Sequence, residues 1–201
     1  MRRQLVSLGL AAALTVAAGA ALAVSNGGPA PAFTISDTAG KPVRLADYRG
    51  KYVVLEWTNP ECPFVRAHYS SGNMQALQKE WGGRQVVWLS INSTNRSHGE
   101  FKTAGEMREW MTAQGAAPAA TLIDETSGAA RTYDARTTPH MFIVDPAGSL
   151  IYQGAIDDKR SANPADARTA NNYVRAALTE ALAGKPVAVA STTPYGCSLK
   201  Y

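Results

Sequence analysis

The chain has 201 residues, enough for one α/β domain with a substantial core and too few for two such domains. Its formal net charge is +4, and loss of Arg2 and Arg3 with an N-terminal leader would leave 4 − 2 = +2. So small and scattered a charge gives no basis for a nucleic-acid partner, and we expect none.

The first 23 residues have the layout of a secretory signal peptide, with a basic start, an apolar Ala/Leu run and a small-x-small site ending at Ala23. An uncleaved anchor is the alternative, because residues 5–24 are about long enough to span a bilayer. The many small residues favour cleavage after Ala23. We therefore expect an exported protein, periplasmic or secreted, without stable membrane insertion after cleavage. Two cysteines in such a chain suit a compartment that permits disulfides.

The rest of the chain is expected to divide into three parts, a linker (24–31), one domain (32–184) and an extended tail (185–201). The tail carries Cys197, the second of the two cysteines. The domain opens with two short strands around a glycine turn, followed by the apolar strand 52–57.

Cys62 comes shortly after this strand and is followed directly by Pro63. A residue before proline is disfavoured in the helical region, and proline favours the first helical position. The pattern therefore predicts that Cys62 caps a helix running from Pro63 towards Trp81. Unpaired N–H groups at such a helix start stabilise a thiolate, the form that attacks disulfides. The alternative is an inert, buried cysteine that only packs.

The later elements alternate between strand and helix. We expect a strand at 85–92, a helix at 103–114, a short strand at 120–124, a short helix at 127–135, a hairpin at 140–157 and a last helix at 169–184. This order predicts a three-layer α/β/α sandwich with a mixed central sheet and an N-terminal strand hairpin as an extension.

Three segments together resemble the thioredoxin fold, and more closely the redoxins of the alkyl hydroperoxide reductase/thiol-specific antioxidant superfamily. They are the opening DTAGKPVRLADYRGKYVVL, Cys62 at a strand-to-helix turn, and TTPHMFIVDPAGSLIYQG. The likeness runs from about Pro31 to Gly184, and ECPFV with a late GCS is similar to a peroxiredoxin-like branch. The resemblance implies a cis Thr138–Pro139 peptide that faces the active cysteine.

Two departures from the family pattern bear on the chemistry. Thioredoxins carry a second cysteine three residues after the first, whereas Val65 stands there in this chain. Peroxiredoxins carry a hydroxyl and an arginine where this chain has Asn59 and Pro139, although Thr58 is only one residue away. These departures favour a thiol–disulfide oxidoreductase, with a thiol peroxidase as the alternative.

The resemblance also implies roles for single residues. Aligned with thioredoxin, Cys62 matches the nucleophile and Glu56 matches a buried acid that exchanges protons; an outward-facing glutamate is the alternative. Cys197 is either the resolving thiol, brought in by a mobile tail, or half of a static disulfide.

The Thr138–Pro139 loop, with Pro63 and Asn59 beside Cys62, would bind substrate. A cis-proline loop leaves the backbone groups of the preceding residue free to pair with an incoming peptide.

The partners implied are a disulfide-containing protein or a small-molecule (peroxide) substrate, and an external thiol reductant. We expect no cofactor. A copper-binding, metallochaperone-like module is a further alternative, because Cys62, Cys197 and His140 would suit Cu(I) or Zn. The sequence has no closely spaced ligand motif to support it.

Overall fold

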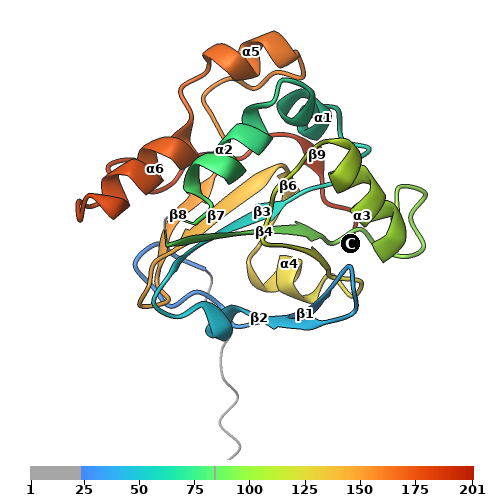
Figure 1. Cartoon of the computed structure of the whole chain (residues 1–201), viewed down its shortest axis with the longest axis horizontal. Helices are drawn as coiled ribbons and strands as arrows, with labels where there is room; N and C mark the ends of the chain where they lie inside the picture. The colour runs from blue at the N-terminus through green and yellow to red at the C-terminus, as the bar shows by residue number, and fades with distance from the viewer. Residues whose placement is uncertain (1–23, 84) are drawn as a thin grey trace, which may run out of the picture.

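The computed structural model describes residues 24–83 and 85–201. Within that part of the chain, seven strands form one mixed sheet in the order β2-β1-β5-β4-β3-β7-β8 (Figure 1). The strands are β1 (Thr34–Asp37), β2 (Pro42–Arg44), β3 (Tyr52–Trp57), β4 (Val86–Asn92), β5 (Ala120–Ile123), β7 (His140–Val144) and β8 (Leu150–Gly154). Strand β3 is central, parallel to β4 and antiparallel to β7.

Helices cover both faces of this sheet. They are η1 (Leu45–Tyr48), α1 (Pro63–Ser70), α2 (Asn73–Trp81), α3 (Ala104–Ala113), α4 (Gly128–Thr132), α5 (Pro164–Thr169) and α6 (Tyr173–Leu182). Figure 1 shows α1, α2, α3 and α6 on one side and α4 on the other, beside β1 and β2. The expected thioredoxin-like α/β sandwich with an N-terminal hairpin is thereby confirmed.

The core follows from the alternation of side chains along the strands. Val54, Met141 and Ile143 pack with α1, α2, α3 and α6. Val53 and Phe142, their neighbours on the other face, pack with η1 and α4. Because β3 and β4 are buried on both faces, their sequences are largely apolar on both faces of the sheet.

The prediction of a single helix from Pro63 towards Trp81 is wrong, because the structure has two helices there. Gly72 adopts φ +80°, a left-handed conformation that ends α1 and starts α2. Helix α1 nevertheless begins as predicted, with Cys62 at the N-cap and Pro63 at the first position. The break lets α1 and α2 each turn an apolar face to the sheet.

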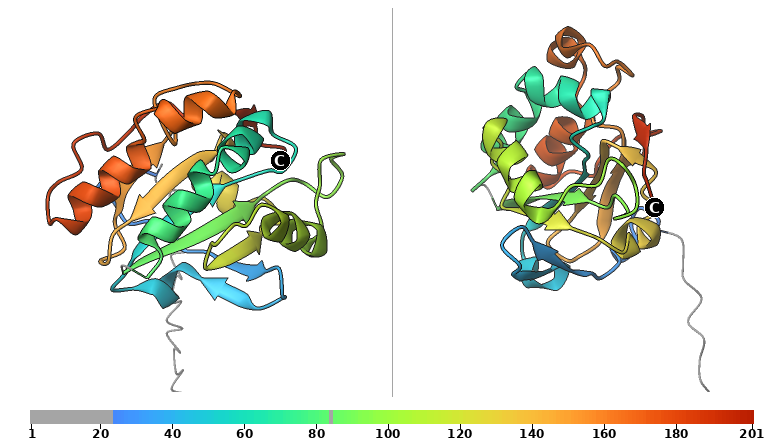
Figure 2. Two further views of the ribbon diagram at one scale, coloured as in Figure 1. Left: turned by 45° about the horizontal axis from the view of Figure 1, so that its top comes forward. Right: turned by 90° about the vertical axis from the view of Figure 1, so that its right-hand side faces the viewer.

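The C-terminal tail is extended over much of its length, as expected, but it ends in a strand. Residues Cys197–Ser198 form β9, which pairs antiparallel with β6 (Thr137–Thr138), the strand just before Pro139. Figures 1 and 2 show the red tail returning across the molecule to lie beside this loop. The last segment of the chain thus reaches the region of Cys62.

Among the described residues, no helix is long and apolar enough to cross a bilayer. The signal peptide predicted at residues 1–23 lies outside the described residues.

Candidate active site

Cys62 lies at the junction between the central strand and α1, which is where the sequence predicted it. Its backbone N–H donates to Asn59 O at 3.1 Å, and its carbonyl accepts the first helical hydrogen bond, from Arg66 N. Its thiol is 1% exposed and donates to the carbonyl of Thr138 at 3.0 Å. The sulfur is thus held between a helix N-terminus and the loop before Pro139.

The Thr138–Pro139 peptide is cis, which confirms the prediction made from the resemblance. Thr138 is buried, and its carbonyl is the acceptor for the Cys62 thiol. The loop therefore faces the Cys62 thiol.

Cys197 is aligned with the same loop. In the β6–β9 register it lies opposite Thr138. Gly196, at φ +135°, permits this approach, since a Cβ there would lie 2.0 Å from the Thr138 carbonyl oxygen. Burial, and then the neighbouring Cys62 thiol, raise the pKa of Cys197 to about 12. No disulfide joins Cys62 and Cys197 in this structure.

Two expectations about this region are corrected. The backbone edge of Thr138 is not free for a peptide, because β9 already pairs with it. The tail is not a loose arm either, since Leu199 N donates to Arg136 O and Asn95 N donates to Lys200 O. Pro194 and Gly196 therefore shape a docked strand, whereas the sequence suggested mobility.

Asn59 builds the turn that leads to Cys62. Its Oδ1 accepts from Glu61 N at 2.8 Å, and its Nδ2 donates to Glu100 Oε2 at 2.9 Å. The amide is therefore occupied at both ends, and Pro63 contributes through the helix start. These contacts give both residues a structural part in shaping the site.

Glu56 is fully buried, on the face of β3 that packs against α1 and α2. Its carboxylate accepts hydrogen bonds from Trp88 Nε1 at 2.7 Å, Tyr69 OH at 2.8 Å and Ser90 Oγ at 2.9 Å. Burial raises the pKa of Glu56, against the opposing effect of these donors. The inward orientation fits the buried acid expected from thioredoxin, although its bonded partners do not include either cysteine.

A peroxidase would need an arginine and a hydroxyl beside the reactive cysteine, and the nearest candidates in the sequence are Arg136 and Thr58. The Arg136 guanidinium pairs with Asp134 on the surface, and its side chain is 71% exposed. The Thr58 hydroxyl is buried without a hydrogen-bond partner in the described part of the chain. No cation is thus directed at the Cys62 sulfur by these residues.

The copper alternative finds no support in the geometry. Across residues 24–83 and 85–201, no group of three His, Cys, Asp or Glu side chains is placed to hold a metal. The His140 ring packs on Phe142, and its Nδ1 accepts from Arg136 N at 3.2 Å. Burial lowers the pKa of His140 to about 3, so it is neutral at physiological pH.

A buried trio beside the site was missed by the sequence analysis. The Tyr195 hydroxyl lies between His68 Nε2, at 3.1 Å, and Asp157 Oδ1, at 2.5 Å. The three residues come from the tail, α1 and the segment after β8. No sequence spacing links them, and the one available signal was a tyrosine two residues before Cys197.

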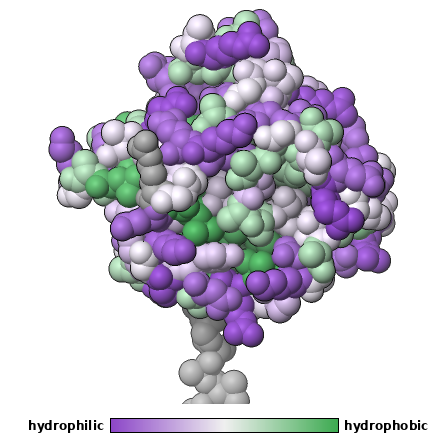
Figure 3. Space-filling view, in the orientation of Figure 1, coloured by the Kyte–Doolittle hydropathy of each residue, from purple (hydrophilic) through white to green (hydrophobic). Residues whose placement is uncertain are grey.

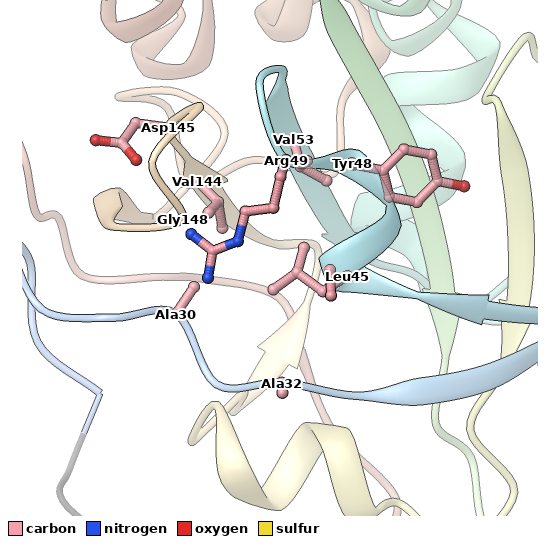
Figure 4. A pocket seen from close by; sticks show the side chains of 10 residues that line it. Ala30, Ala32, Leu45, Tyr48, Arg49, Val53, Val144, Asp145 and Gly148 are labelled. Atoms are coloured by element: carbon pink, nitrogen blue, oxygen red, sulfur yellow. The ribbon is translucent and has the colours of Figure 1, made fainter.

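A separate hollow lies at the opposite end of β3, between η1 and the β7–β8 turn (Figure 4). Arg49 extends across it and donates to the carbonyl of Ala147. It is distant from Cys62 along the strand.

Figure 3 shows hydrophilic residues over most of one face, with hydrophobic surface gathered near its middle.

Comparisons with known proteins agree with this fold. The thiol-disulfide oxidoreductase ResA of Bacillus subtilis (strain 168) is 27% identical over 135 residues, 64% of this chain and 66% of that protein. The chain therefore spans slightly less than two thirds of that relative.

Two solved structures are similar over most of the chain. A conserved, uncharacterized protein from Geobacillus kaustophilus has a TM-score of 0.78 and 29% identity, over 88% of this chain and 92% of that one. A hypothetical protein from Sinorhizobium meliloti 1021 shares the fold, with a TM-score of 0.76 and 24% identity over 90% and 96% of the two chains. The AhpC/TSA family model matches residues 26–153, more than half of the sequence, and this protein therefore belongs to the AhpC/TSA family.

Proposed function

We propose that this protein is a thiol–disulfide oxidoreductase in which Cys62 is the nucleophile and Cys197 the resolving thiol. The observation that carries the proposal is the β6–β9 register, which aligns Cys197 with Thr138, the residue whose carbonyl holds the Cys62 thiol. The similarity to ResA, a thiol-disulfide oxidoreductase by name, supports the same class of reaction.

The reaction proceeds in two exchanges. The Cys62 thiolate attacks one sulfur of a substrate disulfide, forms a mixed disulfide and releases the other substrate sulfur as a thiolate. Cys197 then loses its proton and attacks the Cys62 sulfur, which releases the second substrate thiol and leaves a Cys62–Cys197 disulfide. Two electrons pass from the protein to the substrate, and an external thiol reductant restores both cysteines.

The two thiols are suited to different steps. With a pKa of about 12, Cys197 stays protonated at neutral pH and does not compete as the attacking group. Cys62 is the N-cap residue of α1, and the positive end of the helix dipole there favours a negative charge on its sulfur. Because its thiol is 1% exposed, an incoming disulfide must first displace part of the tail.

Export completes the proposal. The basic start, apolar run and Ala23 site support removal of residues 1–23 and a periplasmic or secreted location. Such a compartment supplies disulfide substrates. Glu56 is proposed to exchange protons with the thiols, and its inward orientation and raised pKa support this role.

The test is the fate of Cys62 in the Cys197→Ser variant. Wild-type protein treated with oxidised glutathione should lose both free thiols without gaining mass from glutathione. Cys197→Ser should instead retain one glutathione on Cys62, because no internal thiol can release it. The control is Cys62→Ser, in which Cys197 should react slowly. Two free thiols persisting in oxidised wild-type protein, counted by mass shift, would refute the proposal.

A further inference from the structure

Tyr195 is the most deeply buried anchor in the last part of the tail. It is 5% exposed, two residues before Cys197, and its ring meets Phe64 edge-on with centroids 5.8 Å apart. Its hydroxyl donates to Asp157 Oδ1, and both His68 and Asp157 are at most 2% exposed. A tail residue thus penetrates to polar groups that solvent does not reach.

The hydrogen bonds fix the direction of each donor in this trio. The Asn73 amide donates to His68 Nδ1 at 2.9 Å, so the His68 proton is on Nε2 and is donated to the Tyr195 oxygen. Tyr195 in turn donates to Asp157. Burial lowers the pKa of His68 to about 4, which keeps the ring neutral at physiological pH. The Tyr195 hydroxyl is therefore used both as donor and as acceptor.

The Asp157 carboxylate is poorly supplied with hydrogen-bond donors. Asp157 Oδ2 is buried and has no hydrogen-bond partner in the described part of the chain; it lies 3.9 Å from His68 Nε2. Loss of the Tyr195 hydroxyl would also remove a buried hydrogen-bond donor from the other carboxylate oxygen, Asp157 Oδ1. Hydrogen bonds to a buried carboxylate are among the stronger ones in proteins.

Only Gly196 separates this anchor from the redox site. Gly196 packs against the Thr138 carbonyl with no room for a Cβ, and Cys197 follows in register with Thr138. With Tyr195 fixed on one side and the β6–β9 pairing on the other, little freedom remains for Cys197.

We propose that Tyr195 is a positioning residue of the redox site: its hydrogen bonds to Asp157 and His68 hold Cys197 opposite Thr138 and keep the tail over Cys62. This inference rests on the proposed function, because it assigns Tyr195 to the resolving step. The anchor also determines access. A substrate whose backbone pairs with β6 must first release Tyr195, because β9 occupies that edge.

The test is the equilibrium in which the reduced protein and oxidised glutathione give the Cys62–Cys197 disulfide and two molecules of reduced glutathione. Tyr195→Phe keeps the ring and removes the hydroxyl, so the effective concentration of Cys197 at Cys62 should fall. We expect the equilibrium constant for forming the Cys62–Cys197 disulfide to drop by about tenfold. Tyr133→Phe is the matched control: it removes another buried hydroxyl, which donates to Pro31 O on the other face of the sheet. It should leave this constant unchanged.

A second measurement does not depend on disulfide formation. In a Cys197→Ser background, Tyr195→Phe should raise the rate of Cys62 alkylation by iodoacetamide several-fold, because the tail covers Cys62 less of the time. Should Tyr195→Phe fail to fold, Asp157→Asn replaces it; this variant keeps an oxygen for Tyr195, removes the charge and should shift both readouts in the same direction.

The outcomes separate the two proposals. A wild-type protein that forms no Cys62–Cys197 disulfide would refute the proposed function, while faster alkylation in Tyr195→Phe would still support the anchor. A wild-type disulfide whose equilibrium constant is the same in Tyr195→Phe, with alkylation also unchanged, would overturn the role of Tyr195 alone.

Discussion

Val65 occupies the helix position at which thioredoxins carry their second cysteine, and its side chain is fully buried in the core beneath α1. Val65 therefore adds to the packing of this helix on the sheet and supplies no thiol next to Cys62. The proposed second thiol comes instead from β9, which pairs with Thr138. A single position, Val65, thus separates this helix start from the two-cysteine pattern of thioredoxins.

Glu56 gives a prediction at the same scale. Its folded-state pKa is raised, so the folded protein holds this proton more tightly than the unfolded chain does. Stability from this group is present below the ordinary glutamate value of about 4.5 and is lost as pH rises through the folded pKa. Glu56→Gln cannot ionise and should lack this decline, as measured by urea unfolding at several pH values.

The control is Glu109→Gln on the exposed face of α3, which should leave the stability curve of the wild type unchanged. The same Glu56→Gln protein also tests the proposed proton exchange. A change in the pH dependence of Cys62–Cys197 disulfide formation would support that role. An unchanged pH dependence would exclude proton exchange and leave Glu56 with a role in core packing alone.

At the level of elements, the break between α1 and α2 depends on Gly72. An L-residue at φ +80° is strained, although space is available for a Cβ there. Gly72→Ala should therefore destabilise the protein by about 1 kcal/mol, measured by denaturant unfolding.

Gly105→Ala is the matched control for this prediction, because Gly105 lies in the first turn of α3 and a Cβ there meets nothing closer than 3.9 Å. It should leave stability unchanged or raise it slightly. Equal losses in the two variants would show that the left-handed conformation is not the cause.

Elements with a long apolar or amphipathic pattern could be predicted from the sequence. The strand 52–57, the capped start of α1 at Cys62 and the hairpin after Pro139 are confirmed. Strands β6 and β9 could not be predicted, because two residues carry no periodicity and their pairing is tertiary. The Tyr195–His68–Asp157 trio could not be predicted either, because its members are far apart in the sequence and only tertiary packing brings them together.

At the level of the whole molecule, the family likeness covers the body of the fold but ends before the tail. The family model matches residues 26–153, whereas Cys197 and Tyr195 lie beyond that range. The body carries Cys62, the proposed nucleophile, and the cis-proline loop. The final segment carries Cys197, the proposed resolving thiol, so the resemblance alone could place Cys62 but not the docked position of Cys197.

The pairing of β9 with β6 also has a thermodynamic consequence. A Cys62–Cys197 bond would close a ring containing most of the folded domain, and closing so long a ring removes conformational entropy from the unfolded chain. Oxidation should stabilise the protein by up to about 4–5 kcal/mol, a rise in melting temperature on the order of 10 °C. Thermal shift measured in defined ratios of reduced to oxidised glutathione should follow the fraction of disulfide, with the Cys62→Ser, Cys197→Ser double variant showing no dependence on the ratio. The melting temperature would then report the redox state of the surroundings.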